Sequence, residues 1–125
     1  MPFVLVLIAI AGLLVTWIGF AGLTGQLRRN FFAGIRTSFT LRNDDNWNAV
    51  HHAAGPVFMF GGVLVTAVAF AFIPFAFAGK LSTLVQVIAA GACAGVMLST
   101  VFVGWYAGTS FAAAREVANT RGRQR

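Results

Sequence analysis

Three long apolar segments alternate with polar ones along this chain of 125 residues. No charged side chain occurs in residues 1–27, 53–79 or 81–114. A helix needs roughly 20 mainly apolar residues to cross a bilayer, so each segment is long enough to cross once. We therefore predict an all-α integral membrane protein with three transmembrane helices. The expected spans are about residues 3–23, 54–77 and 83–106.

The rest of the chain forms a single membrane domain with these spans. A polar motif segment, residues 24–52, separates the first two helices, and Gly79 suits a short turn before the third. The third apolar segment is longer than a bilayer requires, so we expect its helix to extend toward residue 118. A basic tail, residues 119–125, should then fray. The first segment lacks a positively charged start and is expected to remain as a permanent anchor.

Composition supports a membrane class over an ordinary soluble one, because 58% of residues are hydrophobic and only 10% are charged. The net charge of +6 would suggest nucleic acid in a soluble protein. Here the arginines flank apolar helices, so the expected partners are anionic lipid headgroups and not nucleic acid. The single cysteine, Cys93, lies in an apolar segment and is expected to be a small packing residue.

The basic residues also predict the orientation. With three spans, the motif segment and the carboxyl end lie on one face of the membrane, and Lys80 with the amino terminus lies on the other. Positively charged segments stay in the cytoplasm, so we expect the amino terminus outside, the carboxyl terminus inside, and the protein in a bacterial plasma (inner) membrane. The cations on the inner face are Arg28, Arg29, Arg36, Arg42, Arg115, Arg121, Arg123 and Arg125.

The second half of the motif segment predicts the start of a helix. Asn43 is a favourable N-cap, and Asp44 and Asp45 would complement the helix dipole in the first turn. Trp47 and His51 then lie four residues apart on one face. In the first half, Asn30 and Gly34 tolerate unusual backbone angles, and the apolar rings of residues 31, 32 and 39 are expected to dip into the interface.

The order and spacing of these residues resemble the signature of the SdpI family of bacterial membrane proteins. The sequence departs from that signature at Ser38, Phe39 and His52, where the family usually has proline, tryptophan and a basic residue. The matching residues are Asn30, Gly34, Ile35, Arg36, Thr37, Thr40, Leu41, Asn43, Trp47 and His51.

The resemblance implies immunity to a secreted peptide toxin, or signalling with a protein partner at the cytoplasmic face. The family's prototype confers such immunity and signals by holding a repressor at the membrane. The candidate partner-binding site then consists of motif residues in the first half of the segment and at the helix start. Those of the first half are Asn30, Gly34, Arg36, Thr37 and Thr40. Those of the helix start are Asn43, Trp47 and His51.

Arg36 admits two interpretations. It would bind an anionic group of a lipid, toxin or partner, or it would pair with Asp44 or Asp45 and stabilise the loop. His51 is expected to donate a hydrogen bond to the loop at residues 34–40. Adjacent histidines on a helix point about 100° apart and chelate poorly, so we expect no metal. Trp47 is expected to anchor the helix at the interface.

Small residues in the third span form two GxxxG patterns, Gly91–Gly95 and Gly104–Gly108. Such residues let membrane helices approach closely, either within one protomer or across a dimer face. The spans carry no ionisable residue, which argues against a proton relay.

We expect no enzyme and no cofactor, since no acid–base pair or activated nucleophile is evident. An accessory subunit of a larger membrane complex is the alternative function, and a small transporter ranks behind both.

The orientation is testable by cysteine labelling. A cysteine placed in residues 24–43 should not react when intact cells are treated with a membrane-impermeant thiol reagent, because this segment is expected to be cytoplasmic. Reaction from outside would contradict the predicted orientation.

Overall fold

The computed structural model describes residues 2–30 and 32–125, and these ranges contain helices and no strand. Three helices follow one another: α1 (Pro2–Leu23), α2 (Asp44–Phe77) and α3 (Thr83–Arg123). Each helix is long and apolar enough to cross a membrane. In the described residues, the predicted all-α architecture with three helices able to span a membrane is therefore confirmed. Phe31, one of the three rings expected at the interface, lies outside the described residues.

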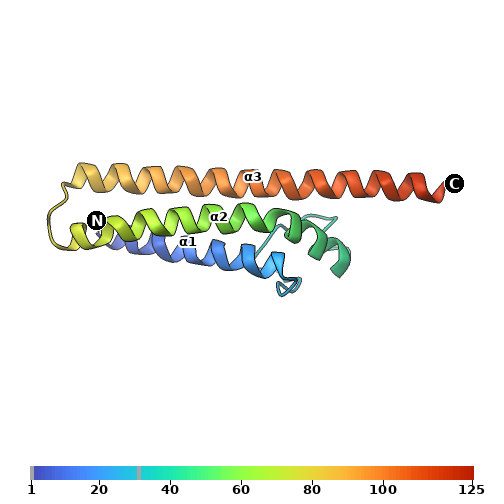
Figure 1. Cartoon of the computed structure of the whole chain (residues 1–125), viewed down its shortest axis with the longest axis horizontal. Coiled ribbons are helices and arrows are strands. Elements are labelled where there is room, and N and C mark those ends of the chain that lie inside the picture. Colours follow the sequence, from blue (N-terminus) through green and yellow to red (C-terminus); the bar gives the residue numbers. More distant parts are fainter. Residues whose placement is uncertain (1, 31) are drawn as a thin grey trace.

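The helices form an antiparallel bundle in which α2 lies beside both α1 and α3 (Figure 1). The amino end of α1 lies near the turn between α2 and α3, and residues 24–43, which we call the connector, lie toward the other end of the bundle. The carboxyl end of α3 projects beyond the other two helices (Figure 1). Because α1 and α3 both pack on α2, they make little direct contact with each other.

The third helix is longer than expected. It continues to Arg123, beyond the expected extension toward residue 118 and into the segment 119–125 that was expected to be a tail. Alanines at 112–114 are strong helix formers, and Arg121 and Arg123 complement the negative end of the helix dipole. Arg42 of the connector also pairs with Glu116 at 3.7 Å, which ties the extension to the rest of the bundle.

Four glycines bring α1 and α2 into backbone contact. They repeat at a spacing of seven residues in each helix, so that Gly12 lies against Gly62 and Gly19 against Gly55. A Cβ added at Gly62 would lie 2.6 Å from the carbonyl oxygen of Gly12, and one added at Gly55 would lie 2.8 Å from that of Gly19. A seven-residue repeat keeps one face of a helix against its partner, and small residues allow this approach in lipid.

The two GxxxG patterns of α3 have different environments. Gly104 and Gly108 face the bundle, where an added Cβ would meet Phe58 at the first position and Val50 and Ile35 at the second. At Gly91 and Gly95 an added Cβ would meet nothing within 4 Å. Of the two patterns, Gly104–Gly108 therefore packs within the protomer, as one of the two interpretations proposed.

We predict that Gly62→Ala destabilises the bundle by about 1–3 kcal/mol, because its new Cβ would force two backbones apart. Gly95→Ala is the matched control, with the same gain in helix propensity but with open space around the new methyl group. Denaturant unfolding in detergent micelles, followed by circular dichroism, measures both. Equal stability of the two variants would contradict backbone contact between α1 and α2.

Candidate functional site

The connector is held to the start of α2 by hydrogen bonds that begin where α1 ends. Gly25 takes a φ of +73°, which turns the chain so that the amides of Gln26 and Leu27 donate to the carbonyl of Ala21 at 2.8 and 3.0 Å. The carbonyl of Leu27 then accepts a hydrogen bond of 2.8 Å from the indole nitrogen of Trp47. Trp47 is fully buried, so it anchors the connector within the fold and is not the interfacial ring that the sequence analysis expected.

Asn30 folds the next part of the connector. Its side-chain oxygen accepts hydrogen bonds from the amides of Phe32 and Ala33, both at 2.8 Å, and its Nδ2 donates to the carbonyl of Arg28 at 2.8 Å. An asparagine amide can thus replace backbone partners in a tight turn. The turn leaves the ring of Phe32 96% exposed, which places an apolar side chain at the outer surface of the connector.

Gly34 brings the connector against His51. It has a φ of +100°, a value that favours glycine, and an added Cβ would collide with Nε2 of His51. The amide of the next residue, Ile35, donates to this same Nε2 at 2.7 Å. Glycine at position 34 is therefore required both by backbone geometry and by the nearby imidazole.

The His51 ring joins the connector to the helix through both of its nitrogens. Because Nε2 accepts from Ile35, the ring proton is assigned to Nδ1, which lies 2.7 Å from the carbonyl of Trp47 and donates to it. The sequence analysis expected His51 to bond to the loop as a donor. The bond exists, but its direction is the reverse, since the connector supplies a backbone N–H and a neutral imidazole supplies the acceptor.

Burial keeps this histidine neutral. His51 is 2% exposed, and its ring stacks on that of Trp47 with centroids 4.2 Å apart. Desolvation by burial lowers the pKa of His51 below its usual value of 6.5, while the hydrogen bond to the Trp47 carbonyl acts in the opposite direction. The neutral form is also the one that the Ile35 amide needs, so burial and hydrogen bonding favour the same protonation state.

Two threonines fold the segment after Ile35. The hydroxyl of Thr40 is completely buried, donates to the carbonyl of Ile35 at 2.9 Å and accepts from the amide of Thr37 at 2.8 Å. The hydroxyl of Thr37 accepts from the amide of Thr40 at 3.3 Å. These bonds satisfy the buried backbone groups of a segment that has no regular secondary structure.

The connector ends at the predicted helix start. Asn43 is the N-cap of α2, with its side-chain oxygen accepting from the amide of Asn46 at 2.8 Å, as the sequence indicated. Asn46 itself donates to the carbonyl of Phe39 at 3.0 Å. Arg29 bonds to the carbonyl of Leu41 at 3.0 Å and pairs with Asp44 at 3.5 Å. The roles of Arg29 and Asn46 were missed, since neither belongs to the recognised motif.

The side chain of Ile35 was also missed as a site residue. It is 5% exposed and forms a core with Val50, Ala54 and Phe58 of α2 and Ala112 of α3. The connector is thus inserted between two helices and does not lie freely over them. The place of Ile35 in the recognised motif, between Gly34 and Arg36, was the available signal.

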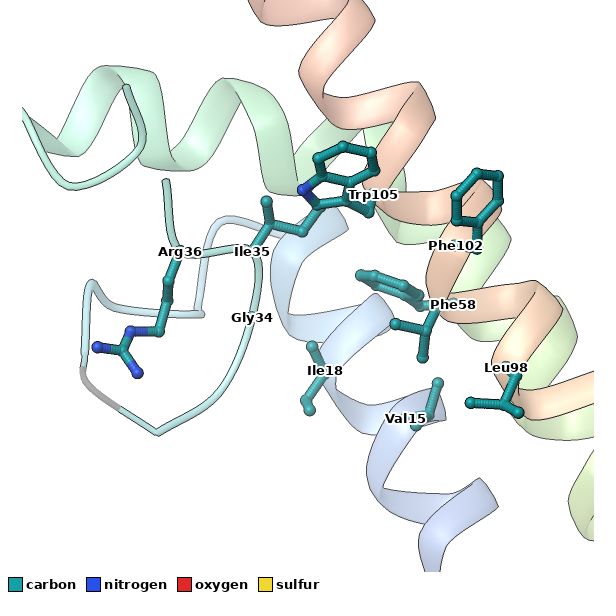
Figure 2. A pocket seen from close by; sticks show the side chains of 10 residues that line it. Val15, Ile18, Gly34, Ile35, Arg36, Phe58, Leu98, Phe102 and Trp105 are labelled. Atoms are coloured by element: carbon teal, nitrogen blue, oxygen red, sulfur yellow. The ribbon is translucent and has the colours of Figure 1, made fainter. Parts of the chain in front are cut away.

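Of the eight predicted site residues, Arg36 has a different position from the others. The seven others lie where the connector folds on itself or meets α2. Arg36 is exposed and lines the edge of a cleft between the connector, α1 and α3 (Figure 2). It is the motif side chain best placed to meet another molecule.

The ligand-forming side chains are dispersed in the part of the chain that the structure describes. No group of three histidine, cysteine, aspartate or glutamate side chains gathers there. Both nitrogens of His51 already make hydrogen bonds, so ligation of a metal would break the attachment of the connector.

The sequence of this site also falls within the match to a known protein family. The family model described as the SdpI/YfhL protein family matches residues 26–106. The match covers well over half of the chain and includes nearly the whole connector, all of α2 and much of α3. The resemblance inferred from the motif is thereby confirmed. No curated protein and no solved structure matched the chain.

We predict that acid releases the connector. The pKa of His51 is lower in the folded protein than in the unfolded one, so the unfolded state binds the proton more readily. The stability that this contact adds to the fold is therefore present above pH 6.5, and it is lost as the pH falls through the lowered pKa. Protonation also places an N–H against the amide of Ile35. In a chain carrying Trp17→Phe and Trp105→Phe, the fluorescence of Trp47 should change with a midpoint below pH 6.5.

His52→Asn is the control for this titration, because His52 bonds only to the carbonyl of Leu23 among the contacts described. It should keep the transition, whereas His51→Asn should abolish it. A midpoint above 6.5, or a transition that survives His51→Asn, would show that another group controls the connector.

Proposed function

Because the chain belongs to the SdpI/YfhL protein family, we propose that it is a non-enzymatic membrane protein that confers immunity to a peptide toxin or signals the toxin's presence. The spans would meet the toxin in the membrane, and the connector would engage a protein partner. The observation that carries this proposal is the match of the family model across the connector and the two helices that follow it.

The rigidity of the connector supports a recognition role. The side chain of Asn30 accepts a hydrogen bond from the connector backbone, those of Thr40 and Trp47 donate to it, and Ile35 is inserted into the core. A surface that is already ordered loses less conformational entropy when a partner binds. Hydrogen bonds also engage the hydroxyl of Thr37 and both nitrogens of His51, groups that would otherwise be available for catalysis.

Arg36 supplies the charge for recognition. It follows the buried Ile35 directly, so the inserted isoleucine fixes the position of the arginine backbone. A guanidinium can form paired hydrogen bonds with a carboxylate or a phosphate. We therefore assign Arg36 to contact with an anionic group of the partner.

The proposed orientation places this surface in the cytoplasm of a bacterial cell. Eight of the nine cations lie on the connector or the end of α3, and Lys80 lies on the turn between α2 and α3. The positive-inside rule then puts the amino terminus outside and the connector inside the plasma membrane. A partner that binds the connector would be a cytoplasmic protein or a membrane protein with a cytoplasmic face.

The proposal predicts a loss of protection when the connector is altered. A strain without the gene should be killed at lower doses of a peptide toxin encoded beside it, and the wild-type gene should restore tolerance. Gly34→Val should fail to restore it, because valine strongly disfavours positive φ and its side chain would collide with His51. Arg36→Ala should fail because the cation is lost.

Two variants serve as controls for these losses. Gly91→Val lies in open space on α3, and Arg121→Ala removes a cation outside the connector. Both should protect like the wild type, with all five proteins equally abundant in the membrane fraction. Immunity is excluded if the deletion strain tolerates every neighbouring toxic peptide as well as its parent. Full protection by both connector variants would exclude the connector as the active surface.

A further inference from the structure

The bundle contains a cleft whose apolar walls on α1 and α3 have no part in the immunity proposal. It has a volume of about 620 Å³, which lies in the range of roughly 300–1,000 Å³ typical of ligand sites. Its walls come from α1, α3 and the connector, and Phe58 of α2 also lines it (Figure 2). The cleft arises because α1 and α3 both pack on α2 and make little contact with each other.

The cleft is apolar over most of its length. Val15 and Ile18 line it from α1, and Leu98, Phe102 and Trp105 line it from α3. Leu98 and Phe102 are 72% and 64% exposed, so these walls are open to the surrounding lipid. Such a surface suits a flexible hydrocarbon chain, which has no polar group that would need a hydrogen bond there.

One end of the cleft is cationic. Among the residues that the structure describes, Arg36 is the charged one that lines it. Figure 2 shows the guanidinium of Arg36 on the connector side, well apart from Phe102 and Leu98. The site therefore has a positive group at one end and apolar walls along the rest of the cleft. This arrangement is complementary to an amphiphile with an anionic head.

The position of the cleft along the bundle fits a membrane lipid. The indole of Trp105 lines the cleft near its connector end (Figure 2), and aromatic rings favour the headgroup layer. Arg36 lies at this same end, where lipid phosphates would be. Val15 of α1 and Leu98 of α3 line the part of the cleft further from Arg36, where the acyl chain would lie (Figure 2).

We propose that this cleft binds one acyl chain of an anionic phospholipid whose phosphate contacts Arg36. The charge of the site selects an anionic headgroup over a zwitterionic one, and the apolar walls hold the chain. This site shares Arg36 with the proposed partner surface, but lipid binding in the cleft does not require the proposed function to be correct.

Fluorescence quenching tests the proposal with the full chain in vesicles. The protein carries Trp17→Phe, so that the cleft residue Trp105 and the buried Trp47 are the remaining tryptophans. Phosphatidylglycerol with brominated acyl chains is titrated into phosphatidylcholine, and brominated phosphatidylcholine is titrated into phosphatidylglycerol. We expect phosphatidylglycerol to reach half-maximal quenching at a mole fraction about fivefold lower, the selectivity that one arginine near the surface supplies.

Paired variants assign this selectivity to the cleft. Arg36→Gln should remove the preference for phosphatidylglycerol, whereas Arg121→Gln, with the same net charge, should keep it. Val15→Phe should reduce quenching by filling the cleft, whereas Val63→Phe on the exposed face of α2 should not. Arg36→Lys should retain part of the preference, which keeps the charge assignment testable if Arg36→Gln fails to insert.

Two results would overturn the proposal. Equal quenching by the two brominated lipids in the otherwise wild-type chain would mean that α3 contacts bulk lipid and that the cleft selects no headgroup. A preference for phosphatidylglycerol that Arg36→Gln and Arg121→Gln reduce equally would mean that net charge, and not this cleft, attracts the lipid.

Discussion

The hydrogen bond from the Ile35 amide to Nε2 of His51 is the contact on which the organisation of the connector depends. At 2.7 Å it attaches an irregular segment to the first turns of α2, and it requires both glycine at position 34 and a neutral imidazole. The side chain of Ile35 enters the core on the other side of the same backbone. One residue thus joins the connector to α2 by its amide and to the core by its side chain, and Arg36 takes its position from it.

Close backbone contact between α1 and α2 complements this attachment. Inside lipid the hydrophobic effect does not drive helices together, so packing and hydrogen bonding must hold the pair. The paired glycines at 12 and 62 and at 19 and 55 provide that packing. Helix α3 packs on α2 through Gly104 and Gly108 and contacts α1 little, and this asymmetry opens the cleft beside the connector.

Arg36 connects the two proposals. It stands at the boundary between a rigid polar connector and an apolar cleft, so a headgroup phosphate and an acidic group of a partner would both recognise its guanidinium. Occupancy of the cleft by lipid would then place an anion beside the surface that a partner uses. The lowered pKa of His51 maintains this surface at neutral pH, because the neutral ring is what holds the connector in place.

The sequence by itself determined the helical class, the number of spans, the cap at Asn43 and the family, because each depends on local composition or on a fixed spacing of residue types. The sequence also predicted, from their spacing of four residues, that Trp47 and His51 lie on one face of the helix. It did not predict that Trp47 would be buried, that His51 would accept a hydrogen bond, or that α3 would continue to Arg123. Those outcomes depend on which groups meet across the bundle. The pairing of Gly12 with Gly62 and the cleft between α1 and α3 exist only once the helices are packed, since residues far apart in the chain create them together.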